Sequence, residues 1–345
     1  FKVMKYLVTG GAGFIGGHVA ARLLNDGGTV VIIDCLKNNY NPQMKLDTLN
    51  YLKTIPTGNL FIYSFSLSES DCVRKIFETY AFDAILHLAA HPGVRASVEN
   101  PMMCAMEDVP SMALLLECAH QFKVPHFVYA SSSAVYGGSS KAPFSENDTC
   151  DRPVSPYGAL KRACELLGHS FADLYGMPVT CLRFFTVFGP RCRPDMATFK
   201  FIDLIWKGKP IPMYGDGSSR RAFTFISDIV NGIISTLRTP SGYRIINLGG
   251  EKSYTLSQFI SAIERCLGKK AIIQQYSPQA GDVLITSADQ TVALAELNFR
   301  PTVSLEEGLK LTFEWYLNFV EAKKENFQMT ESNVTSLPIS ARVET

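Results

Sequence analysis

Residues 9–16 read Thr-Gly-Gly-Ala-Gly-Phe-Ile-Gly, and they are the strongest local signal in the chain. They follow a short β-rich run, Lys5–Thr9, and open a helical stretch that extends to Leu24. Glycines at this spacing let the backbone approach a diphosphate closely, and a helix N-terminus adds free amides and a positive dipole end. Because the glycines stand between a strand and a helix, they predict a dinucleotide-binding turn that uses Gly10, Gly13 and Gly16.

The next strand-like run, Thr29–Asp34, ends on an acidic residue. A carboxylate at that place can accept hydrogen bonds from a ribose diol, and it repels a 2′-phosphate. Asp34 therefore favours NAD over NADP as the cofactor. Lys37, three residues further on, would soften that preference.

Short apolar runs alternate with helical stretches through the first half of the chain, which predicts an α/β fold with a doubly wound parallel sheet of the Rossmann type. The runs are Lys5–Thr9, Thr29–Asp34, Leu60–Ser64, Ala84–Leu88, Phe127–Ser131 and Val179–Phe184. After Phe185, loops rich in Gly, Pro and Arg interrupt this rhythm. We expect a Rossmann domain in residues 1–184 with 223–250, a smaller α/β substrate lobe in 185–222 with 251–325, and a flexible tail in 326–345.

Composition excludes several classes of protein. Hydrophobic residues make up 46% and charged residues 19%, which is typical of a globular chain. A net charge of +1 offers no field for nucleic acid, and no apolar run reaches the ~18 residues of a membrane span. Nine scattered cysteines without a CxxC pair indicate neither a metal site nor a disulfide framework, and they favour a reducing, cytoplasmic setting. The chain begins at Phe1 without a signal peptide, so an upstream anchor stays an open alternative.

Tyr157 and Lys161 stand at i and i+4 in the sequence SPYGALK, after a plausible cap at Ser155. On a helix their side chains are neighbours, and a fixed ammonium favours the phenolate form of a tyrosine. The serine cluster 131–133 ends the strand-like run Phe127–Ser131, at the sheet edge where ligands of open α/β folds bind. A serine hydroxyl there could hydrogen-bond a substrate oxygen and the tyrosine.

Five motifs occur together in one order: TGGAGFIG (9–16), HLAA (87–90), SSSAVYG (131–137), SPYGALK (155–161) and LRFFTVFGP (182–190). From about Tyr6 to Tyr316 the chain resembles the extended short-chain dehydrogenase/reductase family, and within it the nucleotide-sugar epimerases. GVRAS (93–97) and GPRCRPDMA (189–197) resemble UDP-glucuronate 4-epimerases more than UDP-glucose 4-epimerases.

The resemblance implies site residues for an NAD cofactor and a UDP-sugar. Those of the cofactor are Gly10, Gly13, Phe14, Ile15, Gly16, Asp34, Ser66, Leu67, Leu88, Ala89, Ala90, Tyr157 and Lys161. Those of the substrate are Arg95, Ser132, Ser133, Thr186, Arg193, Arg221 and Asp282, with Thr186 and Arg193 near a hexuronate carboxylate and Arg221 at the diphosphate. Tyr157, Lys161 and Ser132 would be the catalytic residues.

The implied reaction is C4 epimerisation of UDP-glucuronate to UDP-galacturonate, through a 4-keto sugar that turns before it is reduced. The positions after Ser132 hold Ser133 and Ala134 instead of the acidic residues of related dehydratases and decarboxylases, which favours simple epimerisation. Two alternatives stay open: a UDP-glucose/UDP-galactose 4-epimerase, and an NAD-binding scaffold protein with a weakened site.

Several positions depart from the family pattern. Ser66 stands where an acidic residue contacts the adenine, Asp108 replaces an asparagine, and Ala222 replaces an aspartate. Pro110 lies inside the helical stretch Met102–Phe122, where it should kink the helix or delay its start. Because family members pair this stretch and Tyr157–Tyr175 across a two-fold axis, the resemblance also implies a homodimer.

Overall fold

A seven-stranded sheet, with every neighbouring pair parallel, forms the centre of the molecule in the order β10-β6-β5-β4-β1-β2-β3. The computed structural model describes residues 2–37, 40–138, 142–278 and 283–334. The strands of this sheet are β1 (Lys5–Thr9), β2 (Thr29–Ile33), β3 (Asn59–Tyr63), β4 (Ala84–His87), β5 (Phe127–Ser132), β6 (Val179–Phe184) and β10 (Tyr243–Leu248). The predicted doubly wound Rossmann sheet is confirmed, and β1 and β6 have the predicted bounds.

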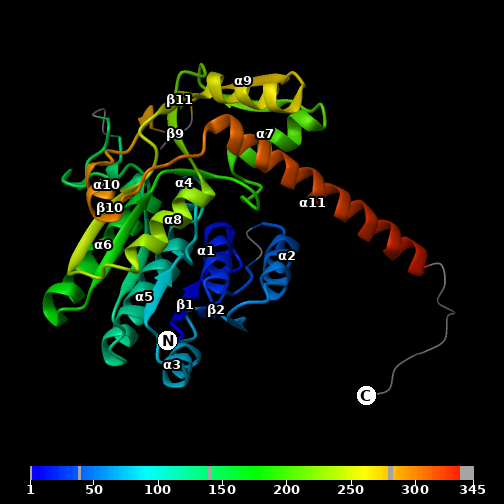
Figure 1. Ribbon diagram of the computed structural model, residues 1–345. Helices are drawn as coiled ribbons and strands as arrows, with labels where there is room; N and C mark the ends of the chain where they lie inside the picture. The colour runs from blue at the N-terminus through cyan, green and yellow to red at the C-terminus, as the bar shows by residue number, and fades with distance from the viewer. Residues whose placement is uncertain (1, 38–39, 139–141, 279–282, 335–345) are drawn as a thin grey trace.

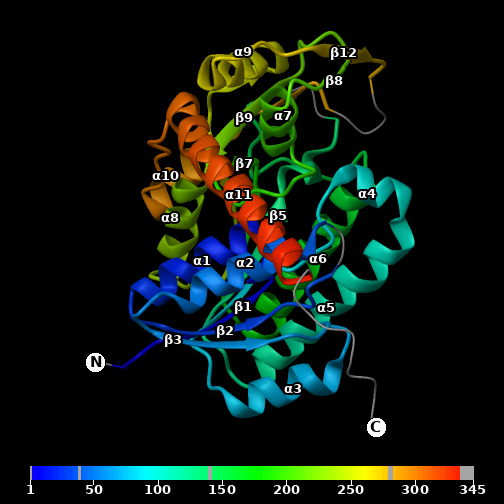
Figure 2. The same ribbon diagram turned by 90° about the vertical axis from the view of Figure 1, so that its right-hand side faces the viewer.

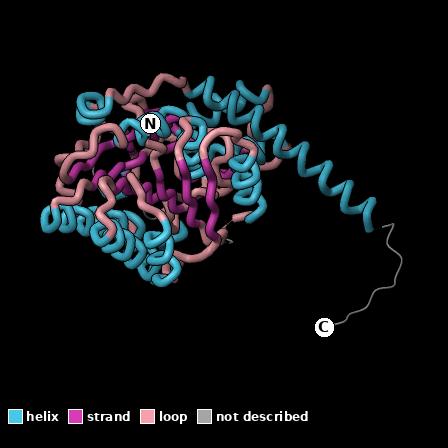
Figure 3. Tube along the Cα trace, turned by 60° about the horizontal axis from the view of Figure 1, so that its bottom comes forward, coloured by secondary structure: helices cyan, strands magenta, loops and turns pink. Residues whose placement is uncertain are grey.

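Alternate residues of each strand enter two different cores, because successive side chains of a strand point to opposite faces. In β1, Leu7 packs with the helices of one face and Val8 with those of the other. Helices therefore cover both sides of the sheet (Figure 3). One layer holds α1 (Phe14–Asn25), α2 (Pro42–Lys53) and α8 (Ile226–Thr236), and the other holds α3 (Ser70–Thr79), α5 (Pro101–Gln121) and α6 (Pro156–Tyr175).

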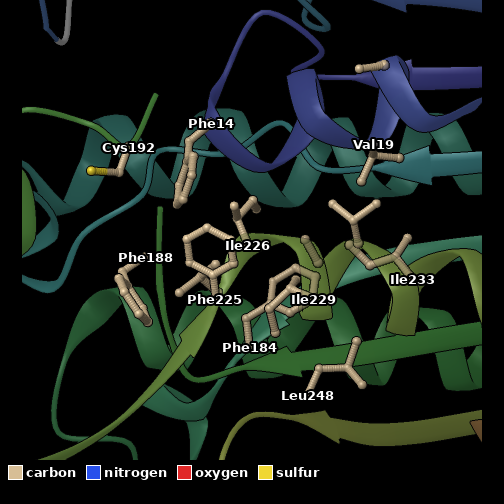
Figure 4. Close-up of a cluster of buried hydrophobic side chains, with 14 of the residues drawn as sticks. Phe14, Val19, Phe184, Phe188, Cys192, Phe225, Ile226, Ile229, Ile233 and Leu248 are labelled. Carbon is tan, nitrogen blue, oxygen red and sulfur yellow. The ribbon is translucent and has the colours of Figure 1, made fainter. Parts of the chain in front are cut away.

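The first core continues from the sheet into the smaller lobe. Figure 4 shows Phe14 and Val19 of α1 facing Ile226, Ile229 and Ile233 of α8, with side chains of the sheet below them. Phe188 and Phe225, whose ring centroids lie 5.5 Å apart, extend the cluster toward the lobe. The two parts of the molecule therefore share one continuous core.

Short strands and three helices build the lobe (Figure 1). The strand β9 (Arg220–Phe225) pairs with β7 (Thr186–Phe188), β11 (Ser253–Thr255) and β13 (Ile285–Thr286), while β8 (Ile211–Tyr214) pairs with β12 (Ile273–Tyr276). The helices are α7 (Ala197–Trp206), α9 (Leu256–Leu267) and α11 (Leu305–Val334). The remaining elements of the described residues are α4 (Val94–Glu99), the 3₁₀ turn η1 (Ser133–Tyr136) and α10 (Thr291–Leu297).

Two expectations about the helices differ from the structure. The helix α5 continues through Pro110 without a late start, because its buried face packs against the sheet and outweighs one lost backbone hydrogen bond. The helix α11 extends to Val334, so residues 326–334 of the expected tail are helical and continue the helix that begins at Leu305. Residues 335–345 lie outside the described part of the chain.

The expected domain boundaries also differ in two places. The boundary at residue 223 falls inside β9, whose pairing with β7 and β11 keeps all of that strand in the lobe. The helix α10, expected in the lobe, contacts α8 and β10, because Ala293 and Leu297 are buried in the core shared with α8.

Candidate active site

A cavity of about 480 Å³ lies outside the carboxyl ends of β1, β4, β5 and β6. It brings together nearly all the residues predicted for the site from distant parts of the sequence. Those that line it are Gly10, Gly13, Phe14, Ile15, Gly16, Asp34, Ser66, Leu67, Leu88, Ala89, Ala90, Ser132, Ser133, Tyr157, Lys161, Thr186, Arg193 and Arg221. Parallel strands explain this convergence, because their carboxyl ends share one edge of the sheet.

The glycine-rich turn between β1 and α1 leaves no space for side chains. Gly10 has a φ of +71°, and a Cβ there would lie 2.8 Å from the Cα of Ala89. A Cβ on Gly16 would lie 2.2 Å from the carbonyl oxygen of Gly10. Gly13 is the N-cap of α1, and it has no side chain to occupy the first-turn amides that every helix leaves without an internal partner. This end of the cavity therefore suits an anionic group at the helix N-terminus.

The Asp34 carboxylate follows β2 and is buried beside this turn. Its Oδ2 accepts a hydrogen bond from the amide of Ala12 (3.0 Å), and its Oδ1 accepts one from the amide of Leu36 (2.9 Å). Two amides therefore hold the carboxylate in the cavity wall. Carboxylate oxygens have further lone pairs, so Asp34 can still accept hydrogen bonds from a ribose diol.

The N-terminus of α6 presents the predicted tyrosine and lysine. The Ser155 hydroxyl caps the helix by accepting from the amide of Gly158 (3.1 Å), and the Ser97 hydroxyl accepts from the amide of Tyr157 (3.0 Å). The buried Lys161 Nζ donates to the carbonyl oxygen of Ala130 (2.7 Å) and lies 5.7 Å from the centroid of the Tyr157 ring. A fixed ammonium and a phenol thus occupy the same wall of the cavity.

The serines that end β5 divide between the cavity and the core. The Ser132 Oγ lies at the cavity and accepts a hydrogen bond from the amide of Ala134 (3.1 Å), so its own proton remains available for another acceptor. Ser131 donates to the buried carboxylate of Glu165 (2.5 Å), which also forms a two-pronged ion pair with Arg183. Ser132 therefore stands next to a residue, Ser131, that the core holds in place.

Basic residues of the lobe line the opposite part of the cavity. The guanidinium of Arg193 makes two hydrogen bonds to Asp195 (2.9 and 2.8 Å). Burial lowers the pKa of Arg193, but this pairing outweighs burial and raises it overall. Of the other predicted substrate residues, Arg95 on α4 lies outside the cavity lining, with its guanidinium 4.7 Å from the ring centroid of Tyr214. Asp282 lies outside the described residues.

Several lining residues were not predicted, namely Tyr40, Lys45, His91, Glu107, Met196 and Thr286. Of the departures from the family pattern, Ser66 and Asp108 line the cavity, and Ala222 is buried outside it. Burial disfavours the Asp108 carboxylate, but hydrogen bonds from His91 and the charge of Lys161 hold its pKa below the usual value. The HLAA motif (87–90) next to His91 carries no signal for these contacts, because they join residues that are distant in the sequence.

The residues present fit a dinucleotide. The glycine-rich turn follows β1 at the switch point between β1 and β4, where the strand order reverses, and it offers a helix N-terminus that a Cβ would obstruct. The Asp34 carboxylate lies next to this turn, at the end of β2. Within the described residues, no group of three or more His, Cys, Asp or Glu side chains could hold a metal ion. No helix in that part of the chain is long and apolar enough to cross a membrane.

Comparisons with known proteins agree with this geometry. A UDP-glucuronate 4-epimerase of Thermodesulfobacterium geofontis is 42% identical, over 95% of this chain and 98% of its own length. The crystal structure of UDP-glucuronic acid 4-epimerase from Bacillus cereus, in complex with UDP-glucuronic acid and NAD, has a TM-score of 0.86 at 33% identity and covers 92% of this chain and 100% of that chain. UDP-glucose 4-epimerase from Thermotoga maritima, with UDP-glucose, has a TM-score of 0.85 at 30% identity with the same coverage. The sequence profile of the NAD dependent epimerase/dehydratase family matches residues 6–249, and this chain belongs to that family.

Proposed function

We propose that this chain is an NAD-dependent epimerase that inverts C4 of a UDP-hexuronate and interconverts UDP-glucuronate and UDP-galacturonate. One observation carries the proposal: Tyr157, Lys161 and Ser132 line the same cavity as the glycine-rich turn and Asp34. The relatives that match nearly the whole chain include UDP-glucuronate 4-epimerases of bacteria and of Arabidopsis thaliana.

The cofactor end of the cavity would be formed by the glycine-rich turn, Asp34, Ser66, Leu67 and the segment 88–90. When bound, NAD supplies a reversible two-electron oxidant for the sugar carbon. Asp34 would accept the ribose hydroxyls, and the N-terminus of α1 would face the diphosphate. Because the reaction causes no net consumption of NAD, tight retention of the dinucleotide is compatible with turnover.

Tyr157 is the acid–base residue of the proposal. Its phenolate oxygen takes the proton of the sugar 4-hydroxyl and returns it after the sugar has turned. The ammonium of Lys161, fixed on the carbonyl oxygen of Ala130, stabilises the negative charge on that phenolate oxygen. Ser132 donates its free hydroxyl proton to the oxygen at C4, which holds that oxygen beside Tyr157.

The substrate end must hold the nucleotide while the sugar turns. Binding energy therefore belongs on the diphosphate, with Arg221 as its proposed partner, instead of on the hexose ring. Arg193 and Thr186 are proposed at the hexuronate carboxylate, and Arg193 would then exchange or share its partner Asp195. By resemblance alone, Arg95 stays a proposed substrate contact, and Asp282 stays a proposed contact of the nucleotide end.

Conversion of Tyr157 to phenylalanine tests the proposal. The variant and the wild type are incubated separately with UDP-glucuronate and with UDP-glucose, and the 4-epimers are separated by chromatography. We expect the wild type to convert the uronate and Y157F to lose at least about 10³-fold in rate, since it removes the group that moves the proton. Tyr175→Phe, at the exposed far end of the same helix, is the matched control and keeps full activity.

Three results would contradict parts of the proposal. Undiminished epimerisation by Y157F would contradict the proposed role of Tyr157 as the acid–base residue. Conversion of UDP-glucose in preference to the uronate would make the chain a UDP-glucose 4-epimerase. Absence of conversion of either sugar, with NAD bound, would favour a scaffold protein.

A homodimer is proposed through α5 and α6. Both helices pack together on one face of the sheet, and they still expose large apolar side chains: Met102, Met103, Met106, Leu166 and Leu174. Exposed apolar side chains on two helices that pack together suit an interface between two copies. Sedimentation at micromolar concentration should show a dimer, and Met106→Glu should shift it toward monomer.

The nine unpaired thiols support a further proposal, that the enzyme works in a reducing compartment such as the cytoplasm.

A further inference from the structure

Four ionisable side chains meet in the cavity wall near Asp34: Lys37, His91, Glu107 and Asp108. The Lys37 ammonium forms an ion pair with the Glu107 carboxylate of α5. The His91 ring lies against both partners, with its Nε2 at 3.3 Å from the Lys37 Nζ and at 3.4 Å from a Glu107 oxygen. The Asp108 carboxylate accepts from the His91 amide (2.9 Å) and fixes the histidine from the other side.

The position of Lys37 gives this ion pair a chemical meaning. Lys37 belongs to the loop that follows β2, three residues after Asp34, and both line the cavity. The Lys45 ammonium donates to the Lys37 carbonyl oxygen (2.9 Å) and so ties the loop to α2. Cations beside the ribose site are the usual partners of a 2′-phosphate, which carries up to two negative charges. An unpaired Lys37 would therefore oppose the selection that Asp34 makes.

Resting on the proposed NAD-dependent function, we propose that Glu107 is a specificity-determining residue that occupies the Lys37 ammonium and thereby denies a 2′-phosphate its counter-charge. The carboxylate also adds a negative charge to the wall that Asp34 already makes negative. NAD has hydroxyls instead of the phosphate, so it does not need the ammonium. Two acidic residues from distant segments, Asp34 and Glu107, then exclude NADP together.

The surroundings argue against a purely structural role for this pair. The side chains of Lys37 and Glu107 are 34% and 30% exposed, and ion pairs that accessible add little to stability. On the same helix, Glu117 pairs with Arg74 (3.0 Å) outside the cavity. Each pair joins a cation to a carboxylate of α5, but only the pair of Lys37 and Glu107 lines the cofactor cavity. Glu117 therefore provides a matched control.

A competition experiment tests the assignment. The wild type and the variants E107Q, E117Q and K37Q/E107Q are each equilibrated with equal concentrations of NAD and NADP, and the protein-bound dinucleotides are released and quantified. We expect the bound NADP-to-NAD ratio to rise about tenfold or more in E107Q, since a charge-assisted hydrogen bond to phosphate becomes possible. The ratio should stay at the wild-type value in E117Q and fall back in K37Q/E107Q. The E107Q gain should shrink as salt is raised.

The outcomes separate this assignment from the proposed function. If the wild type binds NAD and E107Q shows the wild-type ratio, Glu107 does not set specificity and the assignment is overturned, while the epimerase proposal stands. If the ratio rises equally in K37Q/E107Q, the ammonium is not the phosphate partner and the assignment also fails. If neither dinucleotide binds any of the proteins, the proposed function itself fails.

Discussion

The carboxylate of Glu165 should contribute more to stability than any exposed acidic residue of the chain. It lies fully buried on α6, one turn after Lys161, and holds three neighbours. It accepts from Ser131 Oγ (2.5 Å), from Arg183 Nε and Nη2 (both 2.9 Å) and from Arg162 Nη1 (3.0 Å). Glu165→Gln keeps the shape of the side chain but removes its charge and turns one acceptor into a donor.

The loss of stability in E165Q can be estimated from Arg183, the charged partner that remains in the core. The side chain of Arg183 is 1% exposed, and its Nη1 already has no hydrogen-bond partner among the described residues. The neighbouring Tyr136, whose ring centroid lies 4.7 Å from the guanidinium, is neutral and cannot replace the charge of the carboxylate. Breaking a buried ion pair on one side costs about 3–5 kcal/mol, because the remaining charge is uncompensated. We therefore expect the free energy of unfolding of E165Q to fall by about 3 kcal/mol or more.

Urea unfolding measures this loss. With a slope of about 3 kcal/mol/M, the midpoint should fall by roughly 1 M or more at unchanged slope. The control is E117Q, whose exposed pair with Arg74 should change the free energy of unfolding by less than about 1 kcal/mol. A midpoint for E165Q as close to wild type as that of E117Q would refute the reasoning, because the buried guanidinium would then not depend on the carboxylate.

Two further predictions concern pH and the glycine-rich turn. Burial and the charge of Arg244 lower the pKa of His126 to about 4, below the ~6.5 of an unfolded histidine, so the unfolded state binds more protons between these values. Stability is then lost as the pH falls from about 6.5 toward 4; at pH 5 this histidine should cost ~2 kcal/mol, and the urea midpoint of His126→Asn should fall less between pH 7 and pH 5 than that of wild type. Gly16→Ala places a Cβ 2.2 Å from the Gly10 carbonyl oxygen and should reduce NAD retention on gel filtration at least about tenfold, whereas Gly250→Ala, whose Cβ would meet nothing closer than 3.4 Å, should retain it. Equal retention by the two variants would contradict the close fit of the turn.

The central sheet could be predicted because its inner strands, such as β2, β4 and β6, are buried on both faces and therefore appear as continuous apolar runs. The predicted β6 has the observed bounds, and β4 and β5 differ by one residue each. The lobe offers no such signal. Its strands β11 and β13 have three and two residues, and they exist because β9 lies between them, a long-range pairing that no periodicity encodes.

The residues of the candidate site were likewise predictable only where the signal is local in the sequence. Residues that act through a local geometry, such as the glycines of the turn or Tyr157 and Lys161 at helical spacing, could be named from the sequence. The cluster around Lys37 could not, since Glu107 is 70 residues away along the chain and meets it only because β2 ends and α5 begins at the same edge of the sheet. The roles assigned to Arg95 and Asp282 rested on resemblance alone and stay predictions.

The helix α6 explains why a reactive tyrosine can be held rigid while a sugar turns beside it. Tyr157, Lys161 and Glu165 follow one another at i, i+4 and i+8, so each lies about 6 Å further along nearly the same face of the helix. Lys161 is fixed on a carbonyl oxygen of β5, and Glu165 on a serine of β5 and an arginine of β6. The phenol is thus positioned by a row of contacts that passes from the cavity into the core. Since one fixed acid–base group must serve the oxygen at C4 before and after the sugar has turned, the motion belongs to the ligand, and the helix holds the tyrosine in the fixed position that this motion requires.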